Sequence, residues 1–203
     1  MPQNQPQECQ SNDTDRRVGL RAVLLSLTVL ATTSAVQAVI FFLTGSVALL
    51  TDLIHNTGDA LTAVPLAISF VRPSRRASRN AELFVLGAIL VSAVAAGIEA
   101  IRRVAGGRPP DHLLVLAAGG VVGAIGNWTA AQIRTRTGRA INNAALMADG
   151  DHALIDAFVS LAVVLSALLV YLGFSIADPL IALASVVIIV LITIHAWRII
   201  ASN

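Results

Sequence analysis

The chain contains little cysteine, no lysine, and few charged or aromatic residues. Cys9 is the single cysteine, which excludes an intrachain disulfide, a cysteine-based zinc site and a Cys-x-x-Cys redox motif. Charged residues make up 13% of the chain, whereas a soluble domain carries roughly 25%. Hydrophobic residues make up 56%, so the chain needs lipid as its solvent. A net charge of +2 is too small to indicate a nucleic-acid partner.

Six long apolar stretches follow a polar N-terminal segment. Residues 1–17 are expected to form a disordered cytoplasmic tail rather than a signal peptide, because no apolar stretch follows soon after a basic start. Each later stretch has about the 17–25 residues that a helix needs to cross a bilayer, or a few more. The sequence therefore predicts an all-α fold, with a six-helix transmembrane domain over residues 18–203. The expected spans are Leu20–Leu43, Ser46–Val71, Ala81–Ile101, Leu113–Ile133, Asn143–Tyr171 and Ile176–Trp197.

The basic residues are all arginine, and their distribution predicts the orientation in the membrane. Six spans place both termini on one side of the bilayer, and 11 of the 14 arginines then lie on that side. Because cytoplasmic loops carry an excess of arginine and lysine, both termini are expected in the cytoplasm. The absence of lysine and the abundance of alanine suggest a bacterial protein, and hence the bacterial cell membrane. The other three arginines are Arg102, Arg103 and Arg108.

Ionisable residues within the expected spans concentrate in two clusters that share one pattern. An ionisable side chain in a bilayer costs about 2.5 kcal/mol or more, so such residues point to function. The second and the fifth spans both read Asp-x-x-His-x-x-x-Asp-Ala, starting at Asp52 and at Asp149. A related pattern in the two halves of a membrane chain indicates a shared central site. Because the copies are offset by three spans, an odd number, the two segments are expected to run antiparallel.

The spacing of histidine and aspartate in each copy suits a metal ion. Residues four apart lie one above the other on a helix, so His55 and Asp59 share a face, as do His152 and Asp156. Two imidazole nitrogens and two carboxylates form a ligand set suited to tetrahedral Zn²⁺. The lack of sulfur argues against copper(I), whereas Cd²⁺, Co²⁺ and Fe²⁺ fit the same ligands less specifically. One histidine alone would more often make an interhelical hydrogen bond, so the metal-site hypothesis rests on the paired copies. No organic cofactor is expected.

Three further aspartates lie beside the expected ligands. Asp52 and Asp149 precede the two histidines by one helical turn. Two interpretations remain open for them: they orient the imidazole N–H groups, or they cap and hydrate the mouth of a channel. Asp151 has no counterpart in the first copy and points to another helix face, so we expect it in a vestibule.

Several segments extend this signal along the chain. They are Gly45–Asp52 leading into His55 and Asp59, then Glu99, Arg102, Arg103 and Pro109, then Asn127, then Ala148–Asp149 leading into His152 and Asp156, and finally Ala177–Pro179. Together these segments resemble the cation diffusion facilitator family over about residues 18–200. The resemblance implies a six-helix domain that exchanges a cytoplasmic divalent cation for protons. Within that family, two histidines and two aspartates at the central site go with zinc.

The sequence departs from the family pattern in three places, one of which is the connection between the fourth and fifth spans, where a histidine-rich tract is lacking. The sequence ends at Asn203, directly after the sixth expected span, so we expect the usual C-terminal cytoplasmic domain to be missing. The connection Arg72–Asn80 has neither histidine nor an acidic residue, so the accessory metal site of some members is not expected there. Any homodimer would then form through the transmembrane helices.

The ligand chemistry predicts how protons and metal exchange. A metal needs neutral imidazole and ionised carboxylate, so metal binding expels protons. Histidine has an unperturbed pKa near 6.5, so His55 and His152 exchange protons for metal in the physiological range. The sequence therefore predicts efflux of a divalent cation, Zn²⁺ first, driven by protons that move inward.

Other functions use the same polar residues. A proton-coupled transporter of another small cation would more often line its pocket with aromatic residues, which make up only 4% of the chain. An intramembrane metalloenzyme would need a general base, and the His-Glu-x-x-His motif is absent, so an enzyme is not expected. A metal-binding subunit that does not itself transport remains a third alternative.

Overall fold

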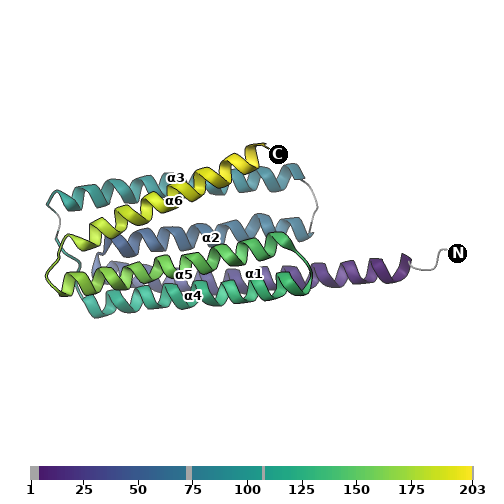
Figure 1. Cartoon of the computed structure of the whole chain (residues 1–203), viewed down its shortest axis with the longest axis horizontal. Helices are drawn as coiled ribbons and strands as arrows, with labels where there is room; N and C mark the ends of the chain where they lie inside the picture. The colour runs from purple at the N-terminus through teal and green to yellow at the C-terminus, as the bar shows by residue number, and fades with distance from the viewer. Residues whose placement is uncertain (1–4, 72–74, 107, 203) are drawn as a thin grey trace.

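The computed structural model describes residues 5–71, 75–106 and 108–202, and its regular elements are all α-helices. Helices that follow one another in the sequence run in opposite directions along the long axis (Figure 1). The start of α1 and the end of α6 therefore lie at one end of the bundle, which we call the terminal end. Gly45 and Gly173 lie in connections at the opposite end, the far end. The helices are α1 (Gln5–Thr44), α2 (Val47–Val71), α3 (Arg75–Val104), α4 (Leu113–Ala140), α5 (Ala144–Tyr171) and α6 (Ala177–Ser202).

The all-helical class is confirmed, and each expected span falls within one helix or within a residue or so of it. The positions of α2 and α3 match the second and third expected spans, while the crossing of six helices stays a prediction. Within the described residues, the stretches long and apolar enough to cross a membrane are Thr14–Thr44, Leu113–Ala140, Leu146–Tyr171 and Ala177–Ile194.

The first helix begins earlier than the sequence suggests. Residues 5–17 were expected to be disordered, whereas α1 starts at Gln5 and continues through them. Pro6 falls in the first turn of the helix, where a missing N–H costs nothing. Neither glycine nor another proline interrupts the chain before Gly19, so the helix of the apolar part extends backward.

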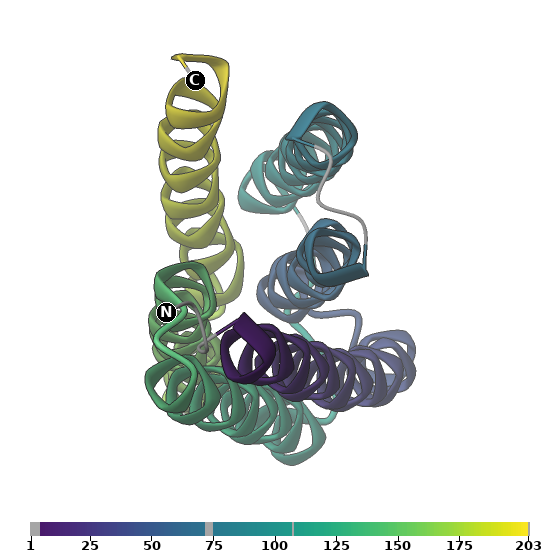
Figure 2. The same cartoon turned by 90° about the vertical axis from the view of Figure 1, so that its right-hand side faces the viewer.

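The helices divide into a group of four and a pair. Viewed from the terminal end, α1, α2, α4 and α5 lie around a common centre, and α3 and α6 stand to one side (Figure 2). The most extensive contact is between α4 and α5, and α1 packs against both α2 and α4. The pair is joined to the group through contacts of α3 and α6 with α2 and of α6 with α5. As a result, α2 contacts both helices of the pair.

A single carboxylate joins three helices at the far end. Asp178, in the first turn of α6, accepts hydrogen bonds from the hydroxyl groups of Ser46 and Ser166 and from the backbone N–H of Val47, the last at 2.8 Å. Val47 begins α2, so the carboxylate also meets the positive end of that helix dipole. The Asp178 side chain is buried, and Ser166 lies on α5. The far ends of α2, α5 and α6 are therefore held together by one charge.

We expect Asp178→Ala to lower the free energy of unfolding by about 2–4 kcal/mol, because three buried donors lose a charged acceptor. Thermal unfolding of the purified chain in detergent measures the effect. Glu99→Ala is the matched control, because Glu99 pairs with Arg103 at a partly exposed position and should cost no more than about 0.5 kcal/mol. Equal stability of the two variants would contradict this role of Asp178.

Candidate functional site

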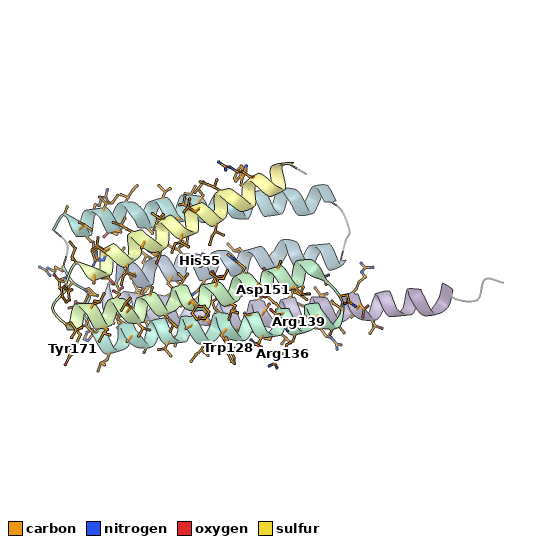
Figure 3. All side chains as sticks on the ribbon, viewed as in Figure 1. His55, Trp128, Arg136, Arg139, Asp151 and Tyr171 are labelled. Carbon is orange, nitrogen blue, oxygen red and sulfur yellow. The ribbon has the colours of Figure 1, made fainter. Side chains whose placement is uncertain are left out.

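The structure brings three of the four expected ligands together between α2 and α5. One nitrogen each from His55 and His152 and one carboxylate oxygen of Asp156 lie within 4.8 Å of one another. The Nε2 atom of His55 is 2.6 Å from Oδ1 of Asp156, and the Nε2 atom of His152 is 3.6 Å from its Oδ2. His55 lies between the two ends of the bundle (Figure 3). The expected convergence of the two copies is thus present in the fold.

The distances suit a tetrahedral cation with a small adjustment. Metal–ligand bonds of about 2.0–2.2 Å in a tetrahedron put two ligand atoms about 3.3–3.6 Å apart. The His152–Asp156 pair already has this separation, at 3.6 Å. The His55–Asp156 pair, at 2.6 Å, is a hydrogen bond and would have to open. His55 and Asp156 are buried, while the His152 side chain is 34% exposed, so His152 is the ligand most open to the surroundings.

The fourth expected ligand follows one turn later on α2. Asp59 lies within that helix, four residues after His55, which places it next to His55 on the helix surface. Its side chain lies outside the part of the chain that the structure describes. The assignment of Asp59 to the ligand set therefore stays a prediction.

The carboxylate of Asp52 takes part in a hydrogen-bond network, while both expected roles of this residue stay predictions. Its carboxylate is buried and accepts hydrogen bonds from Gln37 Nε2 at 2.6 Å and from the Ser160 hydroxyl at 2.8 Å, with Asn56 Nδ2 at 3.5 Å. Asn127 Nδ2 donates to Asn56 Oδ1 at 2.7 Å and to Ser160 Oγ at 3.2 Å. These five residues form what we call the Asp52 network. Gln37 of α1, Asn56 of α2 and Ser160 of α5 are thus the direct partners of this buried aspartate. Asn127 of α4 contacts it only through Asn56 and Ser160.

Asp149 occupies the equivalent position of the second copy but has a different partner. Its carboxylate lies 3.0 Å from Nη1 of Arg134, which is almost completely buried on α4. The Nε atom of Arg134 also donates to the Ser26 hydroxyl of α1 at 2.9 Å. The neighbouring Asp151 is exposed, and its expected place in a vestibule stays a prediction (Figure 3). Asp149 therefore joins α5 to α4 and α1 on the terminal side of the candidate site.

Gln37, Asn56 and Ser160 belong to this arrangement, although the repeated motif does not point to them. A signal was present in the first span, where Ser26, Thr33 and Gln37 are spaced by seven and four residues. Such spacing places polar residues on one face of an otherwise apolar helix. All three are buried in the bundle. The spacing shows which residues face inward, but it does not reveal the partners on other helices.

A glycine on α4 leaves room for the Asp52 network. A Cβ atom on Gly123 would lie 2.5 Å from Gln37 Nε2, 2.8 Å from Asp52 Oδ2 and 2.9 Å from Ser160 Oγ. Contacts this short are not found for real Cβ atoms, so any side chain at this position would displace the network. Small residues allow such close approach of helices in membranes.

We expect Gly123→Ala to destabilise the chain by about 1–3 kcal/mol, because the methyl group overpacks the Asp52 network. Gly87→Ala on α3 is the control, since a Cβ there meets nothing within 4 Å and should change stability by less than about 1 kcal/mol. Thermal unfolding in detergent compares the two. If Gly123→Ala is as stable as Gly87→Ala, the close approach is not required.

Comparison with known proteins gives one family. A family model described as the cation efflux transmembrane domain matches residues 23–203. Curated proteins from two Mycobacterium tuberculosis strains, each described as a probable cation efflux system protein, are 46% identical over 176 residues, which is 81% of this chain and 53% of theirs. A protein of Synechocystis described as an uncharacterized transporter is 30% identical over 172 residues, covering 79% of this chain and 56% of its own length. The chain spans about half the length of the curated relatives it matches.

Proposed function

This chain belongs to the cation efflux family, and we propose that it carries a divalent metal cation, with Zn²⁺ as the preferred cargo, out of the cytoplasm. The observation behind the proposal is the cluster of His55, His152 and Asp156, which two separate helices bring within 4.8 Å. We place Asp59 as the fourth ligand, because it lies one turn from His55 on α2. Two imidazoles and two carboxylates favour Zn²⁺ over softer or larger ions, with Cd²⁺, Co²⁺ and Fe²⁺ as weaker alternatives.

Proton exchange follows from the same ligand atoms. Two lone pairs cannot face each other at 2.6 Å, so the contact between His55 Nε2 and Asp156 Oδ1 contains a proton. A cation that binds both atoms must displace that proton, and we propose that the proton leaves the site rather than moving to Nδ1 of the same ring. Metal and proton therefore compete for one site. This competition supports antiport, in which protons entering the cell drive the metal out.

Alternating access requires the ends of α2 and α5 to separate in turn. At the far end, the Asp178 carboxylate fastens both helices to α6. The cluster is therefore expected to open first toward the terminal end. The excess of arginine at that end predicts that it faces the cytoplasm. Arg136 and Arg139 lie toward this end, and Tyr171 lies at the other (Figure 3). Release on the opposite side of the membrane would require the bonds to Asp178 to part.

Zinc flux into proteoliposomes that contain only this chain tests the proposal. We expect His152→Ala and Asp156→Ala each to reduce the initial rate at least tenfold, because each removes one of four ligands. Asp111→Ala is the matched control, since Asp111 is exposed in the connection between α3 and α4. Its rate should equal that of the wild type.

Two results would contradict the transport proposal in different ways. A wild-type chain that binds zinc but does not move it would favour the metal-binding subunit that does not transport. If His152→Ala and Asp156→Ala move zinc as fast as the wild type, the cation binds at another site.

Collapse of the pH gradient tests antiport separately. In vesicles with an acidic interior and the cytoplasmic face outward, we expect zinc uptake to fall several-fold when an ionophore equalises the pH, because protons leaving the lumen drive metal entry. Uptake is measured with a fluorescent zinc indicator in the lumen. Uptake that is unchanged by the ionophore would rule out proton coupling while leaving zinc transport intact.

A further inference from the structure

Asp52 is a buried carboxylate next to the candidate metal site that is not placed to bind the metal. It precedes His55 by three residues on α2, and Ser160, one of its partners, follows Asp156 by four residues on α5. The Asp52 network therefore occupies the adjacent turn of both ligand-bearing helices, on the far side of the site. Its members are all buried. Asp52 is thus close to the candidate metal site, but its hydrogen bonds go to other residues. The ligand set alone does not explain why a carboxylate stands there.

Along each series of hydrogen bonds in the network, every donor points to the next residue on the way to Asp52. Asn127 donates to Asn56 Oδ1, and Asn56 donates to Gln37 Oε1 at 2.8 Å. Gln37 then donates to Oδ2 of Asp52. On the other branch, Asn127 donates to Ser160, and Ser160 donates to Oδ1 of Asp52. The network thus delivers N–H and O–H donors to both oxygens of the carboxylate.

The direction of these hydrogen bonds favours one charge state of Asp52. An ionised carboxylate only accepts hydrogen bonds, whereas a protonated one must donate to an acceptor. Both oxygens of Asp52 already receive donors, so the hydrogen bonds favour the ionised form and oppose the cost of burying a charge. None of the hydrogen-bond partners of Asp52 among the described residues carries a positive charge. The negative charge is therefore held in place but not neutralised by these partners.

We propose that Asp52 is a fixed negative charge that strengthens the binding of a divalent cation at His55, His152 and Asp156 without ligating it. The proposal rests on the transport function proposed above. The Coulomb energy scales with the product of the charges, and it is weakly screened away from water. A charge one helical turn away therefore favours a doubly charged ion at the site. Because it acts through the field, it should favour every divalent ion alike.

Equilibrium metal binding to the purified wild-type chain in detergent, measured with Zn²⁺, Cd²⁺ and Co²⁺, tests this role. We expect Asp52→Asn to weaken the affinity for all three ions by a similar factor, about tenfold to a hundredfold, and to keep their order of preference. Asp52→Ser removes the same charge while its hydroxyl still accepts a bond from Gln37, so it replaces Asp52→Asn if that variant does not fold.

Two matched variants separate charge from structure. Asp111→Asn removes one exposed charge, and it should leave the affinities within about twofold because water screens it. Ser160→Ala removes one hydrogen bond of the network but leaves the Asp52 charge, so its affinities should stay within about threefold of the wild type.

Three results would overturn the proposal. The first is an unchanged affinity in the Asp52 variants. The second is a loss that differs more than about tenfold among the three ions, because such a loss reports altered ligand geometry rather than charge. The third is an equal loss in Ser160→Ala, which would assign the effect to the hydrogen bonds. If the wild-type chain itself binds none of the ions, the proposed function fails first, so the two failures are distinguishable.

Discussion

Hydrogen bonds between buried polar side chains determine how the helices of this bundle are placed. In lipid, helices gain little from burying apolar surface against each other, so packing and polar contacts must hold them together. Here the polar contacts form successive layers along α5. Ser166 reaches Asp178 at the far end, Ser160 reaches Asp52, Asp156 reaches His55, and Asp149 reaches Arg134 toward the terminal end. Each layer connects α5 to a different set of helices.

Small residues on α4 make these layers sterically feasible. A Cβ atom on Gly120 would lie 2.9 Å from the backbone nitrogen of Val164 on α5, and one on Gly126 would press into Thr33 of α1. The same face includes Gly123, beside the Asp52 network. Because α4 approaches its neighbours this closely, short side chains such as Ser160 and Asn127 bridge between helices. The glycines and the polar layers therefore depend on each other.

The sequence predicted the helices and the pairing of the two copies, because long apolar runs and a repeated motif depend on local order. It did not predict the partners of Asp52 and Asp149, which stand at equivalent positions in the repeat. Those partners come from α1, α2 and α5 in one case and from Arg134 of α4 in the other. Spacing along one helix shows which residues share a face, but it does not show which residue of another helix lies opposite. A polar composition predicts disorder for residues 5–17, and it does not show that the helix of the apolar part continues backward through them.

The unequal partners of the two repeat copies make the charges on the two sides of the candidate site unequal. On the terminal side, the carboxylate of Asp149 is compensated by a guanidinium at 3.0 Å. On the far side, the equivalent carboxylate receives only neutral donors. For the cation proposed at His55, His152 and Asp156, this difference would make the potential more favourable on the far side than on the terminal side. The two copies share the proposed ligand positions, and they differ in how the preceding aspartate is compensated.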